Sequence, residues 1–161
     1  MTNLKVDFYL RLILIISLVA IISAYFIEYV LGHQPCNLCL IERIPYGLSI
    51  ILITLNYYFK KNEQFIILLL ILIFFFSFAI SVYHLGIEQG LFEESAVCGL
   101  KNMTGIISKE EILKQLQEKT VSCKDVTVRI FGLSLTSINI LLSFILIILL
   151  TKIYISYEKN K

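Results

Sequence analysis

Two cysteines separated by two residues, Cys36 and Cys39, are the side chains of this sequence with the clearest capacity for chemistry. Such a pair serves as half of a zinc site, as a structural disulfide or as a redox-active dithiol. Zinc takes about four ligands, and the two histidines, His33 and His84, show no ligand spacing. A disulfide between Cys36 and Cys39 would close a very small loop and remove little entropy from the unfolded chain, so it would stabilise the fold only slightly. The spacing therefore favours redox chemistry and no metal.

Arg43 follows Cys39 by four residues, and residues with this spacing are neighbours on a helix. An arginine within a membrane span costs roughly 2.5–3.5 kcal/mol at midspan and less near the surface. A cation beside a cysteine at a helix N-terminus stabilises the thiolate. The spacing therefore favours a functional role for Arg43 over the alternative that its side chain only extends to the lipid headgroups. Glu42 either pairs with Arg43 or faces water, and the sequence does not choose between these.

A second pair of cysteines, Cys98 and Cys123, lies in a polar segment between two apolar runs. A disulfide that braces a long loop is one interpretation. The other is a relay, in which thiolate attack on a disulfide passes oxidation from this pair to the C-x-x-C pair.

The elements that must position these residues are membrane helices. Hydrophobic residues make up 58% of the 161-residue chain and charged residues 16%, and the apolar residues fall in runs of membrane-spanning length. We predict a single all-α domain over 1–161, a bundle of four transmembrane helices at about 12–31, 38–59, 65–85 and 133–150. The first run is longer than a signal-peptide core and is expected to stay on the chain. Pro45 is expected in an early helical turn.

Basic residues predict the orientation, because they collect on the cytoplasmic side of membrane proteins. In a four-span arrangement seven of them share one side: Lys5, Arg11, Lys60, Lys61, Lys152, Lys159 and Lys161. Both termini are therefore expected in the cytoplasm, with both cysteine-bearing loops outside and a long outward loop over 87–132. Within it, Ser108 to Leu116 has the pattern of a short amphipathic helix, which lies either on the membrane surface or on the core of the loop. The net charge of +2 gives no indication of nucleic-acid binding.

The order of these features resembles the DsbB family of disulfide bond formation proteins over nearly the whole chain. The most specific segment is Pro35-Cys36-Asn37-Leu38-Cys39-Leu40-Ile41-Glu42-Arg43, which lies between the first two spans. The segments 83–90 and 131–139 are also similar to family segments, less specifically. Family members often carry a tryptophan near the start of the fourth span, and this chain has none, which leaves the detail of a quinone pocket open.

The resemblance implies an enzyme of the bacterial inner membrane that reoxidises a periplasmic DsbA-like, thioredoxin-fold oxidant and passes the electrons to ubiquinone or menaquinone. It implies disulfides Cys36–Cys39 and Cys98–Cys123. Cys98 would form the mixed disulfide with the oxidant, and the released Cys123 would attack Cys36.

Further roles implied by the resemblance concern the quinone. Cys39 would remain as a thiolate against the quinone, Arg43 would hold that charge and the reduced ring, and His84 would line the same pocket.

Three alternatives stay open. Vitamin K epoxide reductases also combine a membrane helical bundle with C-x-x-C and a loop pair, although their loop cysteines precede the motif. A relative dedicated to one partner is another. The third is a non-enzymatic scaffold or small transporter with structural disulfides, although transporters should show polar residues at midspan. The sequence does not give the quinone type, the identity and number of partners, the oligomeric state or the role of His33.

Overall fold

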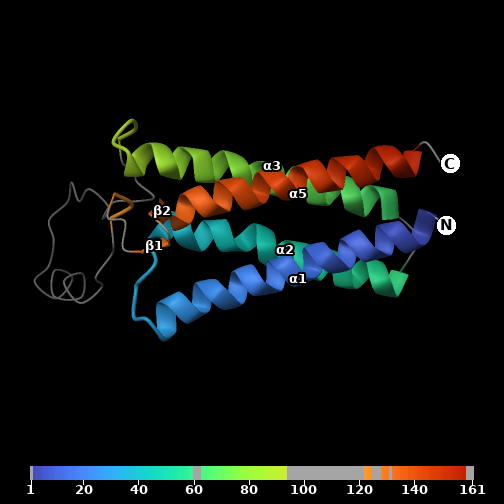
Figure 1. Ribbon diagram of the computed structural model, residues 1–161, viewed down its shortest axis with the longest axis horizontal. Helices are drawn as coiled ribbons and strands as arrows, with labels where there is room; N and C mark the ends of the chain where they lie inside the picture. Colours follow the sequence, from blue (N-terminus) through green and yellow to red (C-terminus); the bar gives the residue numbers. More distant parts are fainter. Residues whose placement is uncertain (1, 60–62, 94–121, 125–127, 131, 159–161) are drawn as a thin grey trace, which may run out of the picture.

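Four long helices run roughly side by side along the molecule (Figure 1). The computed structural model describes residues 2–59, 63–93, 122–124, 128–130 and 132–158. The helices are α1 (Thr2–Tyr29), α2 (Asn37–Phe59), α3 (Glu63–Glu88) and α5 (Leu135–Glu158). Each contains a stretch long and apolar enough to cross a membrane. The predicted fold class, an all-α membrane protein with four transmembrane helices, is confirmed.

The helix bounds differ from the predicted spans mainly at their ends. Helix α1 begins ten residues earlier than the expected span over 12–31, because a helix continues beyond its apolar run wherever the backbone stays hydrogen-bonded. Helix α3 reaches Glu88, three residues past the expected end, so that Glu88 also lies inside it, one turn after His84. Pro45 is the ninth residue of α2, deeper than the early turn expected. Membrane helices tolerate such a proline when their neighbours satisfy the freed backbone groups.

A short antiparallel pair of strands precedes the last helix and was not expected. Strand β1 (Arg129–Ile130) pairs with β2 (Leu133–Ser134), and Gly132 in the turn between them has a φ of 83°, which favours glycine. The Ser134 hydroxyl accepts a hydrogen bond of 3.2 Å from the N–H of Ser137. Ser134 is therefore the N-cap of α5, which explains why this helix begins at Leu135 rather than at the expected 133.

Packing within the bundle joins α3 to α5, α2 to α3, and α1 to α2 most extensively. The core is aliphatic and aromatic, with Phe74 and Leu146 fully buried. Pairs of serines bridge neighbouring helices: Ser49 donates to Ser17 at 2.8 Å, and the hydroxyls of Ser77 and Ser143 lie 3.2 Å apart. Small hydroxyl side chains let membrane helices approach closely while satisfying their own polar atoms.

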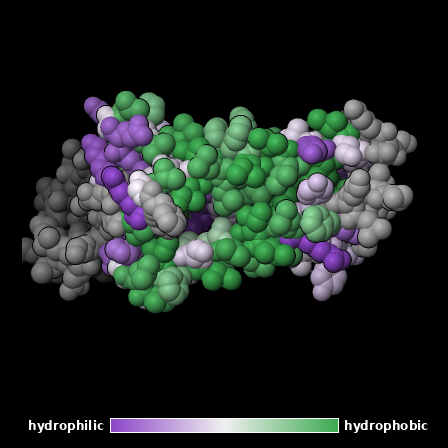
Figure 2. Space-filling view, viewed as in Figure 1, coloured by the Kyte–Doolittle hydropathy of each residue, from purple (hydrophilic) through white to green (hydrophobic). Residues whose placement is uncertain are grey.

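The face of the molecule shown in Figure 2 carries a broad apolar band with hydrophilic residues toward both ends. Large side chains such as Ile22, Phe75 and Phe76 are each more than half exposed, as expected for residues that face lipid. The start of α1 and the end of α5 lie at one end of the bundle, and the start of α2 lies at the other (Figure 1). Cys98 and the helix predicted from Ser108 lie outside the described residues, with most of the predicted loop.

Candidate functional site: a cysteine pair, a histidine and two buried carboxylates around one cavity

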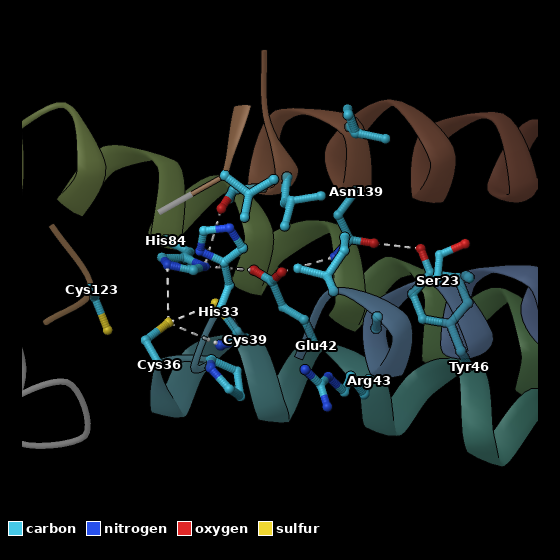
Figure 3. Close-up of a pocket in the computed structure, with 18 of the residues that line it drawn as sticks. Ser23, His33, Cys36, Cys39, Glu42, Arg43, Tyr46, His84, Cys123 and Asn139 are labelled. Atoms are coloured by element: carbon cyan, nitrogen blue, oxygen red, sulfur yellow. Dashed lines mark hydrogen bonds and ion pairs between the residues drawn. The ribbon is translucent and has the colours of Figure 1, made fainter. Parts of the chain in front are cut away.

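A cavity of about 350 Å³ lies at the end of the bundle where α2 begins. All four helices contribute to its wall, and so do the segment before α2 and the segment around Cys123 (Figure 3). Five of the six predicted site residues line it: Cys36, Cys39, Arg43, His84 and Cys123. The sixth, Cys98, lies outside the described residues. The fold therefore brings together side chains from residue 36 to residue 123.

The sulfurs of Cys36 and Cys39 lie close together because the two residues are one helical turn apart at the start of α2. Cys36 is the N-cap of this helix, and its sulfur accepts a hydrogen bond of 3.3 Å from the N–H of Cys39. The two sulfurs lie 2.7 Å apart, and both cysteines are present as thiols. The predicted disulfide between them is thus not formed in this structure, but the sulfurs are placed for it, and the pairing stays a prediction.

Cys36 is the more acidic thiol by its surroundings. The Cys39 thiol donates toward its sulfur, and His84 and the Cys39 backbone N–H add smaller contributions. Together they lower the pKa of Cys36 from 9.0 to about 4, against the opposing effect of burial. The helix N-terminus favours negative charge at the same sulfur. Cys36 is therefore the sulfur that can hold a thiolate when both cysteines are reduced.

Cys123 lies beside this pair. It is 2% exposed and packs in one apolar cluster with Cys36, Leu38 and Ile87. It is disulfide-bonded. Because its predicted partner, Cys98, lies outside the described residues, the pairing Cys98–Cys123 stays a prediction.

His84 connects the cysteines to a buried carboxylate. Its Nε2 lies 3.5 Å from the Cys36 sulfur, and its Nδ1 lies 3.0 Å from Oε1 of Glu42. Glu88, one turn further along α3, has Oε1 at 3.9 Å from Nε2 and accepts a hydrogen bond from Thr136 on α5. The imidazole is 2% exposed, so these contacts are screened little by water.

Arg43 points to a different helix from Glu42. Its guanidinium forms an ion pair with Glu28 of α1 and lies over the ring of Tyr25, 5.1 Å from the ring centre. The side chains of Arg43 and Glu28 are 17% and 20% exposed, at the edge of the cavity. Adjacent residues of a helix do not face each other, which explains why Glu42 and Arg43 have separate partners.

Comparison with known proteins identifies the family of the chain. The family model "Disulfide bond formation protein DsbB" matches residues 7–153. The chain belongs to the DsbB family. An uncharacterised protein of Rickettsia prowazekii is 31% identical over 155 residues, covering 94% of this chain and 90% of the relative. Disulfide bond formation protein B of Cupriavidus pinatubonensis is 28% identical over 158 residues, covering 94% of each. No solved structure matches.

Membership of the DsbB family, together with the four membrane helices, makes the protein a membrane oxidoreductase of disulfide bond formation. The arrangement of the site fits that class. A dithiol in which one sulfur is stabilised as a thiolate, next to a histidine, is suited to thiol–disulfide exchange and to giving up electrons.

Several residues of this DsbB-family site were not predicted from the sequence: Glu28, Tyr46, Ser81, Glu88 and Thr136. Asn139 is the last residue of the segment 131–139 that resembles family segments, and the structure places it in the cavity wall. Glu42, Glu88 and Asn139 all lie within apolar helices, where ionisable and strongly polar side chains are costly and mark functional sites. That cost is the signal that could have identified them.

His84 lies closer to the cysteines than the sequence spacing indicated. Its ligand atom and the sulfurs of Cys36 and Cys39 lie within 4.8 Å of one another, a cysteine–histidine set that zinc accepts. Two sulfurs bound to one zinc at about 2.3 Å each stand well apart, whereas these are 2.7 Å apart. The observed spacing suits a dithiol that closes to a disulfide, and the predicted absence of a metal stays a prediction.

Proposed function

We propose that this chain reoxidises a DsbA-like periplasmic dithiol oxidant and passes the electrons to a membrane quinone, ubiquinone or menaquinone. The observation that carries the proposal is that Cys36, Cys39 and Cys123 line one cavity with Arg43 and His84 at the end of an apolar bundle. In this proposal, a quinone dissolved in the bilayer reaches the dithiol at this cavity.

Exchange begins at the loop pair. A thiolate of the reduced oxidant attacks Cys98, forms a mixed disulfide and releases the sulfur of Cys123. The Cys123 thiolate attacks Cys36, so that a Cys123–Cys36 bond forms, the Cys36–Cys39 bond breaks and Cys39 is left as a thiolate. The second thiol of the oxidant then resolves its mixed disulfide. The burial of Cys36 and Cys123 in one apolar cluster supports the central step, because it brings the two residues together at the cavity.

The cavity suits a quinone ring by its chemistry. Its volume of about 350 Å³ is within the range of small-molecule sites, and its walls include Ala20, Ile21 and Leu142. The guanidinium of Arg43 and the imidazole of His84 are the groups that would hold the carbonyl oxygens. A bound quinone supplies a two-electron, two-proton acceptor. A DsbA-type oxidant has a potential of about −120 mV, so its reoxidation needs an acceptor at a higher potential still.

The proposed location is the bacterial inner membrane, with both termini in the cytoplasm and the cysteines on the periplasmic side. The end of the bundle opposite the cysteines holds the start of α1, the end of α2, the start of α3 and the end of α5. In the sequence, six of the seven basic residues that predict a cytoplasmic side lie within a few residues of these helix ends, and Arg11 follows Lys5 by six residues.

The test is quinone reduction by the purified protein with a reduced thioredoxin-fold oxidant. Cys39→Ser should abolish it, whereas Leu40→Ser, which also puts a serine in the first turns of α2 but at a half-exposed position away from the cavity, should retain it. A reduced oxidant that lacks its second cysteine should attack the Cys98–Cys123 disulfide, release the Cys123 sulfur and stay trapped in a mixed disulfide with Cys98, and mass spectrometry would identify both partners. Full quinone reduction by Cys39→Ser would refute the proposal.

A further inference from the structure

The carboxylate of Glu42 is buried inside a membrane helix, and the relay described above does not use it. Glu42 is 9% exposed and faces the cavity from α2. A buried carboxylate is costly unless hydrogen bonds and opposite charge compensate it, so this one needs a physical reason.

Three helices hold the Glu42 carboxylate in one position. Its Oε1 contacts His84 of α3, and its Oε2 accepts a hydrogen bond of 3.1 Å from Nδ2 of Asn139 on α5. The same Nδ2 donates to the hydroxyl of Ser81 at 2.7 Å, and Tyr46 donates to the amide oxygen of Asn139. This network fixes which way the Asn139 amide points, and the amide in turn fixes the carboxylate (Figure 3).

The contacts of His84 assign its proton. An ionised carboxylate only accepts hydrogen bonds, so the imidazole nitrogen that faces Glu42, Nδ1, carries the hydrogen. Thr136 gives its own hydrogen to Glu88, so its oxygen is a second acceptor, 3.4 Å from Nδ1. The Nε2 atom of the neutral ring is then the free base, and it faces the sulfur of Cys36 at 3.5 Å.

A thiolate on Cys36 needs a cation close to its sulfur, and the Nε2 atom of His84 lies 3.5 Å from that sulfur. Among the described residues, the ionisable side chains of the cavity wall beside it are those of Cys39, Glu42, His84 and Glu88, with His33 on the segment before α2. The Arg43 guanidinium is turned toward Glu28 on α1. Because its ring contacts the Cys36 sulfur directly, protonated His84 is the group best placed to balance a thiolate there.

We propose that Glu42 is a positioning residue that acts through His84, holding Nε2 against Cys36 and stabilising the imidazolium that forms when Cys36 gives up its proton. The step is a proton transfer: the S–H bond of Cys36 breaks, the proton binds Nε2, and the thiolate and imidazolium remain as a pair. Glu42 keeps its charge and touches neither sulfur, as the orienting carboxylate does in other thiol–histidine or hydroxyl–histidine sites. The use of this thiolate in turnover rests on the proposed function, whereas the proton transfer does not.

The test uses a chain with Cys36 as its one cysteine (Cys39→Ser, Cys98→Ser, Cys123→Ser), in which the rate of alkylation against pH gives the midpoint of thiolate formation. Glu42→Gln keeps the shape and removes the charge. This change should raise the pH midpoint of Cys36 thiolate formation by about one unit. At pH values below the midpoint, the thiolate fraction would then be about tenfold lower. Glu63→Gln, the same change at the first residue of α3 and the opposite end of the bundle, should leave the midpoint unchanged.

The decisive comparison repeats Glu42→Gln in a His84→Ala background. Without the imidazole the Glu42 charge can only repel a thiolate, so its removal should lower the midpoint or leave it unchanged. An equal rise in both backgrounds would show that Glu42 does not act through His84 and would overturn the proposal. The proposal would equally fail if Glu88→Gln raised the midpoint and Glu42→Gln did not.

Two further measurements keep the result interpretable. If Glu42→Gln fails to fold, Asn139→Ala loosens the carboxylate without removing it and should raise the midpoint by a smaller amount; an unchanged midpoint in a folded Asn139→Ala protein would then count against the proposal. Alkylation of Cys36 needs neither quinone nor partner protein, so its pH midpoints test the role of Glu42 separately from the proposed function. If the protein failed to reduce quinone, the proposed function would be refuted, but the midpoints would still show whether Glu42 acts through His84.

Discussion

Arg43→Ala should separate disulfide formation from electron transfer to quinone. Arg43 lies one helical turn after Cys39 and lines the cavity, but its ion pair is with Glu28 on α1 rather than with a cysteine. Its removal therefore leaves the contacts among Cys36, Cys39 and His84 in place. We expect both disulfides to form in Arg43→Ala and quinone reduction to be impaired.

The magnitude follows from what the guanidinium contributes. A hydrogen bond to a charged group contributes about 1.5–3 kcal/mol, and each 1.4 kcal/mol is a factor of ten, so the apparent quinone KM should rise about 10- to 150-fold. The cost in stability is smaller. A partly exposed ion pair contributes about 0.2–1 kcal/mol and the contact with Tyr25 about 0.5–1 kcal/mol. The variant should therefore fold and still bind quinone poorly.

The assay is the initial rate of quinone reduction at varied quinone concentration, with reduced oxidant in excess. Arg43→Lys should recover part of the activity, because it restores the charge without the planar fork of the guanidinium. Glu28→Gln should raise KM less than Arg43→Ala, since it frees the guanidinium without removing it. Arg11→Ala removes an exposed arginine elsewhere on α1 and serves as the control. Parental KM and kcat in Arg43→Ala would show that Arg43 is an ordinary interface residue.

Three further predictions concern topology, pairing and pH. Reporter fusions after Lys61 and at the C-terminus should show cytoplasmic activity, and periplasmic activity at either site would reverse the orientation. Peptide mapping after thiol blocking should give Cys36–Cys39 and Cys98–Cys123, and four free thiols in natively isolated protein would rule this out. In the fully reduced chain at pH 6, alkylation should reach Cys36 before Cys39, because its lowered pKa of about 4 keeps it ionised. Equal labelling of the two cysteines would contradict this assignment. Because the folded pKa of Cys36 lies below the ordinary value of 9.0, its thiolate stabilises the folded, reduced protein fully above pH 9. This stabilisation is lost as the pH falls through about 4.

The membrane fold could be predicted from the sequence because its signal is strong and local. A run of about 20 apolar residues has few alternatives to a spanning helix, since the bilayer leaves no other partner for backbone N–H and C=O groups. The predicted ends of the helices were less accurate, because capping interactions rather than hydrophobicity determine where a helix begins and ends. Ser134 and Cys36, each accepting a bond from the N–H three residues later, begin α5 and α2. The hairpin before α5 depends on the positive φ of Gly132 and left no periodic pattern to find.

The cysteines and Arg43 could be identified from spacing, but their partners could not. The sequence left open whether Glu42 pairs with Arg43 or faces water, and in the structure these adjacent residues point in different directions and meet different helices. Spacing on one helix does not say which other helix each will meet. Glu28 and His84, the two partners found, come from α1 and α3 and lie 15 and 42 residues away in the chain. Only the packing of the bundle brings such residues together.

The depth of the polar site follows from the same packing. Toward the middle of the bundle, Ser17 bonds to Ser49 and the ring of Tyr46 packs edge-on against Phe74, which closes the interior with satisfied or apolar groups. Tyr46 also donates to Asn139, so it forms the boundary between this closed core and the network around Glu42. Ionisable groups are costly at midspan and less so near the interface, so a dithiol site with two buried carboxylates is best accommodated at one end of the helices. At this place the proposed partner protein would reach the cysteines and the proposed quinone would reach the cavity, without a charge at the centre of the membrane.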